Sequence, residues 1–420
     1  MSISIMVILL LVLIIGRVPI AYALIIPSLL YLAIEPETSI GMATQRLTAG
    51  ANSFALLAIP MFILLGNLAN ASGLTMRMFD FASAALRNVR GGLGYVNVGT
   101  SVGFSLVSGA AISDAATMGR IQVPQMIERG YDKRFTLGLT AASSLIAPMV
   151  PPSIPAVIYA ITAGVSVSAL FVAGVFPAIV ITVLLLLYVA WKTRRMPKPV
   201  EGEGQDGTSG RFVLLLKVLP ALGAPLVVLG GILAGWFTPT EAAAAGVLYI
   251  LLLGALYRSF TWPSIGEAFK NAASTTASIM LIVVGAGLFG WILAYEQIPQ
   301  LLAESALALT ENPLVFMVIL NLILLLVGAV LEPTAAILIV VPVLAPMAEI
   351  YGIDPVHMGI VVIFNLMIGL LTPPVGLVLF VLSGVTGYRI SEIIRSVVPF
   401  YLLMLVVLVL ITFVPLLVGS

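Results

Sequence analysis

The sequence contains no cysteine and a single histidine, His357, in 420 residues. Without cysteine there is no disulfide framework, thiol nucleophile, iron–sulfur cluster or cysteine-bound zinc. One imidazole is too few for a transition-metal site of the usual kind. His357 follows GIDPV at an expected helix start, where we expect a capping or surface residue rather than a proton relay. These absences exclude most redox and metalloenzyme chemistry.

Charged residues are also scarce, at 9% of the chain, whereas 61% is hydrophobic and the mean hydropathy is +1.18. Soluble domains carry about 25% charged residues, so most of this apolar surface must face lipid. The net charge of +1 leaves no basic surface for nucleic acid. The chain also lacks a Gly-x-x-x-x-Gly-Lys-Ser/Thr loop for ATP. The composition therefore indicates an all-α polytopic membrane protein.

One polar segment, residues 191–211, divides the chain into two halves, 1–190 and 212–420. It is rich in Gly and Pro and begins with several basic residues, which predicts a flexible cytoplasmic linker. A shift of 222 residues superimposes six residues of the first half on identical residues of the second. These are Pro124, Gly130, Asp132, Pro151, Pro152 and Pro177, which fall on Pro346, Gly352, Asp354, Pro373, Pro374 and Pro399.

All six matched residues are Pro, Gly or Asp, which fix backbone shape rather than fill lipid-facing surface, and this indicates one structural plan used twice. Their loops differ in charge. Residues 119–134 include four basic residues, whereas residues 341–356 contain none, and no Lys or Arg occurs between Lys270 and Arg389. The positive-inside rule places the first loop in the cytoplasm and the second outside. We therefore expect inverted repeats, as in many transporters.

Hydropathy and these constraints predict matching elements in the two halves. Each half should contain scaffold spans, an amphipathic arm, a re-entrant hairpin, a broken helix and a last span. The expected ranges are 2–15, 20–34, 50–70, 74–88 (arm), 92–118 (hairpin), 135–163 (broken) and 166–190 in the first half. In the second half they are 212–234, 237–257, 264–294, 298–310 (arm), 312–336 (hairpin), 356–385 (broken) and 390–418.

Four ionisable residues interrupt the apolar segments. We place Arg17 in a cytoplasmic turn, and we expect Glu241, in FTPTEA, to lie in the first turn of a helix capped by Thr238 or Thr240. Asp114 and Glu332 lie instead inside the two hairpins. A carboxylate is costly at membrane depth, so each acid is a candidate functional residue. A shift of 222 residues moves Asp114 to position 336, which is about one helical turn after Glu332. Two acids at nearly equivalent positions of the two halves suggest two cation sites.

Proline-rich breaks lie beside both hairpins, at Pro148 to Pro155 and at Pro373-Pro374. Such breaks free backbone carbonyls, and unwound backbone is tolerated in lipid only where it is buried or lines a site. Carbonyls, one carboxylate and a hydroxyl form an oxygen shell suited to Na⁺. The cation-site candidates are Ser108, Asp114, Ala147, Val150, Gly328, Glu332, Gly369 and Thr372.

The half-helices that begin after the breaks direct partial positive charge toward the membrane midplane, which suits an anionic substrate. A plain proline kink is the alternative for each break, but two kinks at matched positions favour a site. The substrate-site candidates are Gly109, Ala110, Pro152, Ser153, Thr334, Asn365, Pro374 and Gly376.

Several motifs together resemble one transporter family. They are the Ser-Gly-x₄-Asp-x₄-Gly pattern at 108–119, PPSI at 151–154, FTPTEA at 237–242, GIDPVH at 352–357 and TPPVG at 372–376. In this order, over essentially the whole chain, they resemble the large membrane subunit of tripartite ATP-independent periplasmic (TRAP) transporters. Glu332 departs from the resemblance, because an Asp is expected there, and its longer side chain puts direct ligation in question.

The resemblance implies an elevator-type, inverted-repeat transporter of the ion-transporter superfamily in the bacterial or archaeal inner membrane. It also implies Na⁺ coupling and import of an organic acid, such as a C4-dicarboxylate, a sugar acid including sialic acid, or a keto acid. The expected partners are a small four-helix membrane subunit, a periplasmic substrate-binding protein and membrane lipid. No organic cofactor is implied.

Three other functions are alternatives. A stand-alone Na⁺/dicarboxylate carrier of the same superfamily would share the architecture and need no partners. An intramembrane aspartyl-type hydrolase would require Asp114 and Glu332 to act on one water. A channel would need neither paired broken helices nor acids in hairpins. The placement of the two acids beside separate breaks favours the transporter.

Overall fold

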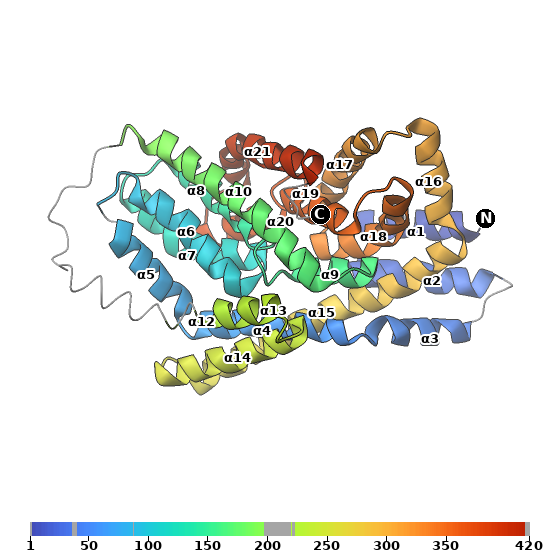
Figure 1. Cartoon of the computed structure of the whole chain (residues 1–420), viewed down its shortest axis with the longest axis horizontal. Coiled ribbons are helices and arrows are strands. Elements are labelled where there is room, and N and C mark those ends of the chain that lie inside the picture. The colour runs from blue at the N-terminus through green and yellow to red at the C-terminus, as the bar shows by residue number, and fades with distance from the viewer. Residues whose placement is uncertain (1, 36–39, 87, 197–219, 221–222, 416–420) are drawn as a thin grey trace.

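The computed structural model describes residues 2–35, 40–86, 88–196, 220 and 223–415, and every regular element in these ranges is a helix. Figure 1 gives their arrangement. In the first half the α-helices are α1 (Ser2–Ile15), α2 (Ile20–Ile34), α3 (Ile40–Ala51), α4 (Ala58–Ala71), α5 (Leu74–Leu86), α6 (Gly92–Ser108), α7 (Ala111–Glu128), α8 (Lys133–Ser143), α9 (Ile154–Ala163) and α10 (Val167–Thr193). The predicted linker lies mostly outside the described residues, as does the predicted start of the second half at 212.

The second half continues from α12 to α21. Its α-helices are α12 (Gly223–Pro225), α13 (Gly231–Leu233), α14 (Pro239–Leu256), α15 (Trp262–Tyr295), α16 (Ile298–Leu309), α17 (Pro313–Val330), α18 (Pro333–Ile350), α19 (Pro355–Gly369), α20 (Leu377–Thr386) and α21 (Ile390–Phe413). A π-helical segment, Leu226–Gly230, joins α12 to α13.

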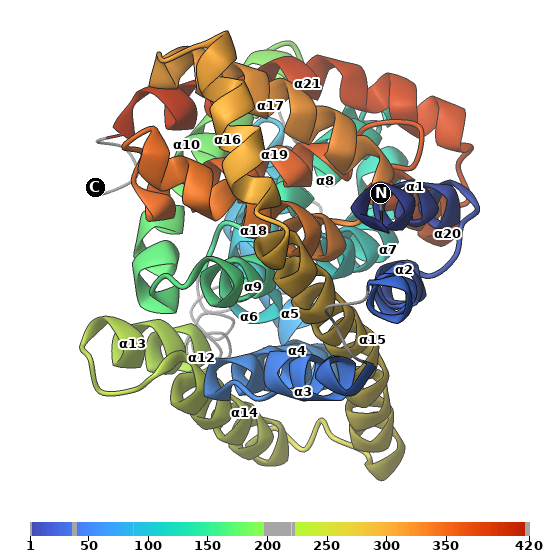
Figure 2. The same cartoon turned by 90° about the vertical axis from the view of Figure 1, so that its right-hand side faces the viewer.

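The helices form two packed bodies, which contact each other where α15 packs on α18 and α4 packs on α6. In the first, the long helix α15 packs against α2, α3 and α4, while α14 packs against α4. In the second, α17 packs on α19, α8 on α21, α7 on α20 and α9 on α18. Figures 1 and 2 both show α3, α4 and α14 below the body that contains α17, α19 and α21. Each body therefore combines helices from both halves of the sequence.

Seven helices are long and apolar enough to cross a membrane, among the described residues. Their outer faces carry large apolar side chains with no protein partner. On α14, for example, Leu248, Leu252 and Leu256 are 62 to 75% exposed. These residues recur at every fourth position and so form one stripe, which lipid would cover.

The helix boundaries repeat with the predicted offset. Helix α18 begins and ends 222 residues after α7, and α19 begins 222 residues after α8. The identical residues lie at matched places in this plan. Asp132 and Asp354 cap α8 and α19, each accepting an N–H bond at 2.8 Å, and Gly130 and Gly352 both have positive φ where the preceding helices end. Shared sequence at these positions therefore marks helix ends.

Two differences from the sequence prediction concern helix extent. The second limbs of the hairpins run to Glu128 and Ile350, past the predicted ends at 118 and 336, because Pro124 and Pro346 are accommodated inside α7 and α18. Helix α3 was not predicted at all. Its sequence, IGMATQRLTAGA, is too polar to be identified as a span, and it is stabilised by packing on α15.

Two predictions about polar residues can also be compared with the structure. Thr238 and Glu241 form the expected helix cap, since each side chain bonds to the other's backbone N–H. The prediction for His357 was wrong. The residue is 6% exposed and its ring contacts the Ile411 carbonyl at 2.8 Å, because α21 packs over the start of α19. The capping residue is Asp354.

Candidate functional site

The first hairpin turns at Gly109 and Ala110, between α6 and α7, directly against the first break (residues 147–153). Gly109 has a φ of 59°, and a Cβ atom there would lie 2.1 Å from the Pro152 carbonyl oxygen and 3.6 Å from the Ser153 Cα. Only glycine satisfies both the backbone conformation and this close approach. The structure thus brings the predicted residues Gly109, Pro152 and Ser153 together.

The second hairpin meets the second break (residues 370–376) in a similar way. A Cβ on Gly369 would lie 2.3 Å from the Gly328 carbonyl carbon and oxygen, so α17 and α19 cross with their backbones in contact. Beyond the crossing, the Val375 N–H donates to the Ala329 carbonyl at 3.2 Å. Each hairpin therefore packs against the break of its own half.

A cavity of about 360 Å³ lies where the two hairpin tips meet α4 and α15. Its size is in the range of small-molecule sites. Helices α4 and α15 contribute Ile63, Gly66, Asn67, Thr275 and Ile279, and the hairpins contribute Ser108, Ala110, Ala111, Ile112, Ser113, Ala116, Glu332, Pro333 and Thr334. The segments around the breaks supply Pro148, Ile154, Pro155, Met367 and Leu370.

Four of the predicted site residues line this cavity: Ser108, Ala110, Glu332 and Thr334. Glu332 is the N-cap of α18, and its Oε2 accepts from the Ala335 N–H at 3.1 Å. It is the one ionisable side chain among the described residues that line the cavity. Ser108 is 6% exposed, and its hydroxyl has no hydrogen-bond partner among the described residues.

Asp114 does not line the cavity but faces α6 and α8. Its Oδ2 accepts from the Ser101 hydroxyl at 2.9 Å, and Ser101 Oγ lies 3.1 Å from Ser143 Oγ. Ser143 in turn donates to Asn97 Oδ1 at 3.0 Å, and Asn97 Nδ2 donates to the Thr140 hydroxyl at 2.8 Å. All five side chains are fully buried, and Asp114 Oδ1 has no partner in the described part of the chain.

Ser108 and Asp114 were predicted to share one cation, but this conformation separates them. Ser101, which binds Asp114, precedes Ser108 by seven residues on α6, a rise of about 10 Å. Oxygen ligands lie within about 2.6 Å of a hard cation, so two ligands of one ion are at most about 5 Å apart. The sequence prediction chose the hydroxyl nearest the tip, whereas the helix turns Ser101 toward Asp114.

The two acids also do not face a common space, because Glu332 lines the cavity and Asp114 does not. A hydrolytic site in which both carboxyl groups activate one water is therefore not formed. Asn365, a predicted substrate residue, is likewise outside the cavity. Its side-chain N–H groups donate to Asn321 on α17, and its Oδ1 is buried without a partner among the described residues.

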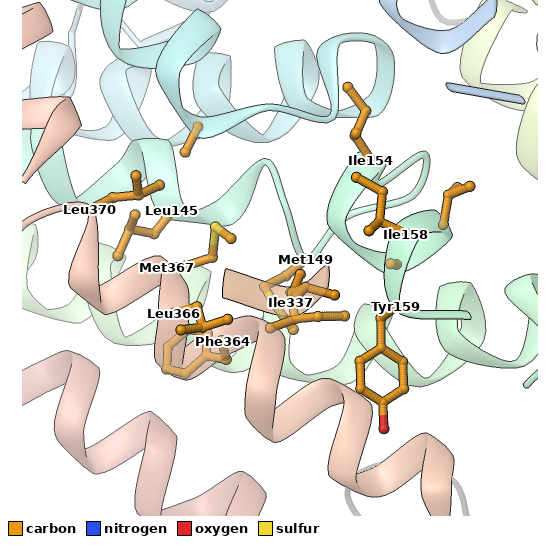
Figure 3. Close-up of a cluster of buried hydrophobic side chains, with 14 of the residues drawn as sticks. Leu145, Met149, Ile154, Ile158, Tyr159, Ile337, Phe364, Leu366, Met367 and Leu370 are labelled. Carbon is orange, nitrogen blue, oxygen red and sulfur yellow. The ribbon is translucent and has the colours of Figure 1, made fainter. Parts of the chain in front are cut away.

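The remaining predicted residues belong to the two breaks, whose Pro151-Pro152 and Pro373-Pro374 peptide bonds are cis. Ser153 caps α9 through the Ala156 N–H, and Thr372 donates to the Ile368 carbonyl. Ala147, Val150, Pro374 and Gly376 lie in the same irregular segments. Figure 3 shows the apolar packing beside the first break, where Met149 lies next to Ile337 of α18.

Sequence reasoning missed the polar residues around Asp114: Asn97, Ser101, Thr140 and Ser143. A signal for them was present. Asn97 and Ser101 are four residues apart on one helix and Thr140 and Ser143 three apart on another, so each pair lies on one helix face. Asn67 and Thr275, on the helices that border the cavity, were also missed.

Comparison with known proteins gives one family. Residues 7–417 match the family described as "Tripartite ATP-independent periplasmic transporter, DctM component". The chain is 40% identical over 403 residues to the sialic acid TRAP transporter large permease protein SiaM of Vibrio cholerae, covering 94% of this chain and 93% of that protein. It is 34% identical over 391 residues to the C4-dicarboxylate TRAP transporter large permease protein DctM of Pseudomonas aeruginosa, covering 92% and 90%.

Among solved structures, the YdaH transporter of Alcanivorax borkumensis has the same fold. The TM-score is 0.63 over 96% of this chain and 98% of that one, at 16% sequence identity. At that identity the likeness concerns the fold alone. It supports the all-helical fold predicted from the sequence.

Proposed function

Because the chain belongs to the DctM component family of TRAP transporters, we propose that it imports an organic acid driven by Na⁺. It is a multi-pass inner-membrane transporter subunit and not an enzyme. Large permeases of this family work with a small membrane subunit and a substrate-binding protein. We propose that both partners are separate polypeptides here, and that the binding protein delivers the acid from the periplasm.

The observation that carries this proposal is the cavity between the hairpin tips. It is bordered by α4 and α15 of the first body and by both hairpins of the second. A site at the boundary between two bodies changes its exposure when one slides past the other. We propose that the body with the hairpins and broken helices moves as an elevator, carrying the acid past α4 and α15.

The first coupling cation would bind at Asp114. No Lys or Arg pairs with this carboxylate in the described residues, and an uncompensated buried charge is unfavourable by several kcal/mol. The hydroxyls of Ser101 and Ser143 and the amide oxygen of Asn97 lie beside it. These uncharged oxygens and a single carboxylate suit a monovalent cation. We keep the carbonyls of Ala147 and Val150 as further candidates.

A second cation would bind where the second hairpin crosses α19. The backbones of Gly328 and Gly369 are in contact there, and Thr372 follows within the break. We assign Glu332 to the cavity instead, because one of its oxygens already caps α18. The second cation would then be bound by carbonyl oxygens and one hydroxyl, without a carboxylate.

The proposed opposite orientation of the two hairpins gives a topology prediction. Arg129 and Glu349, at the ends of α7 and α18, are both exposed, and the native chain has no cysteine. We expect Glu349→Cys, but not Arg129→Cys, to react with an impermeant thiol reagent added to cells whose outer membrane is permeabilised. Labelling of both positions before lysis would contradict inverted repeats, and equal labelling after lysis is the control for reactivity.

The proposed function is tested by uptake in proteoliposomes that contain both membrane subunits, with the binding protein outside. A tenfold inward Na⁺ gradient supplies about 1.4 kcal/mol per coupled ion, so a transported acid should accumulate about tenfold for each ion. A K⁺ gradient of the same size is the control. Equal accumulation with both gradients, or none with Na⁺ for an acid that the binding protein holds, would refute Na⁺ coupling.

A further inference from the structure

Three helices begin at the cavity, and their N-termini differ in how they are capped. Ser153 caps α9, accepting from the Ala156 N–H at 3.2 Å, and Glu332 caps α18. The N-cap of α7 is Ala110, which has no side chain for this role. Uncapped N–H groups and the helix dipole make a helix N-terminus favourable for an anion. Of these three helices, only α7 has no side chain that caps its N-terminus.

The open N-terminus of α7 faces the cavity. Ala111, Ile112 and Ser113, its first three residues, all line the cavity. None of their N–H groups donates to another described residue. The dipole alone would not identify a ligand, since Asp114 in the same first turn carries negative charge. An anion would need a further hydrogen-bond donor beside this N-terminus.

Ser108 supplies this donor. It ends α6 at the other side of the Gly109–Ala110 turn, lines the same cavity, and its buried hydroxyl has no partner among the described residues. Helix α4 closes this corner, because a Cβ on Gly66 would lie only 3.2 Å from the Ser108 Cα. A buried hydroxyl donor without an acceptor is costly, and a ligand oxygen would satisfy it. The first hairpin thus offers donors to one anionic group.

The second hairpin offers the opposite chemistry. The carboxylate of Glu332 lines the cavity, and no basic side chain does so among the described residues. A second anionic group of the substrate would therefore meet a like charge at short range. Hydroxyl or N–H groups of a substrate would instead donate to Glu332.

We infer that the cavity selects a monoanionic acid rich in hydroxyl or amide donors, with its carboxylate at the α7 N-terminus and Ser108 and its donors at Glu332. C4-dicarboxylates would be excluded. This inference rests on the proposed function and specifies its substrate class as that of sugar acids.

The test measures binding to the purified complex of the two membrane subunits in Na⁺, without the binding protein, which has its own selectivity. The monoanionic probes are glucuronate, gluconate and N-acetylneuraminate, and the dianionic probes are succinate and malate. We expect the best monoanion to bind at least about a hundredfold more tightly than either dicarboxylate. A dicarboxylate that binds as tightly as the best monoanion would overturn the inference.

Variants locate the two ends of the substrate. Ser108→Ala should weaken binding of the best monoanion about tenfold. Ser105→Ala, on the same helix but outside the cavity, should not, since its hydroxyl bonds to the Val102 carbonyl. Glu332→Gln should improve dicarboxylate binding and so reduce the discrimination. Unchanged monoanion binding in Ser108→Ala, or unchanged discrimination in Glu332→Gln, would contradict the assignment.

The result separates the two proposals. If Na⁺ drives accumulation of acids but no monoanion binds better than a dicarboxylate, the inference fails and the proposed function stands. If no acid binds and Na⁺ drives no accumulation, both fail. If no acid binds although accumulation occurs, the cavity is not the site and the inference is overturned.

Discussion

We expect the Asp114→Asn variant of the complete transporter to need about thirty- to a hundredfold more Na⁺ for half-maximal uptake. The substitution keeps the shape of the side chain and removes its charge. A lost charge-assisted contact is worth about 2 to 3 kcal/mol, which corresponds to this change in apparent affinity. The variant should still insert and fold, because a neutral amide is less costly to bury than a carboxylate. The measurement is the initial uptake rate across a Na⁺ titration.

Two further variants make this result specific. Asp80→Asn removes an acid from the exposed face of the arm helix α5 and should leave the Na⁺ titration unchanged. Ser101→Ala removes the hydroxyl that donates to Asp114 and should raise the Na⁺ requirement by a smaller factor, about tenfold. Unchanged Na⁺ dependence in Asp114→Asn at normal expression would mean that the acid has a structural role.

The elements that could be predicted from sequence are those whose residues have few structural alternatives. Asp132 and Asp354 mark helix starts because their side chains cap N-termini, and the proline pairs mark breaks because two consecutive prolines remove two backbone donors from the helix. The first hairpin was predicted because its segment is rich in Gly and Ser and begins and ends near basic residues. For these features, local chemistry determines structure.

The remaining features depend on contacts between distant segments. The polar network around Asp114 joins α6, α7 and α8, and nothing within α6 alone indicates that Ser101 rather than Ser108 meets the carboxylate. Burial of His357 requires α21 to lie over α19. Helix α3 forms although it is short and polar, because α15 covers one face of it. Each depends on packing, which sequence periodicity does not specify.

The predicted cation ligands also differ in how far the sequence alone could define their role. Gly328 and Gly369 were named from their breaks and hairpins, and the structure brings their backbones into contact. Glu332 was named as a cation ligand by its charge, yet it caps α18 and lines the cavity. A carboxylate at a hairpin tip can serve a cation, a helix end or a substrate, and only its neighbours distinguish these roles.

The most direct test of the central claim, that this chain is one subunit of a three-part importer, is omission of components from the Na⁺-driven uptake assay. The large permeases of the family to which this chain belongs work with a small membrane subunit and a substrate-binding protein, so we expect uptake to need both partners. Proteoliposomes with the small subunit, the binding protein and a Na⁺ gradient should accumulate the acid, and omission of either partner should reduce uptake to background. Robust Na⁺-driven uptake by this chain alone would contradict the account and identify it as a stand-alone carrier.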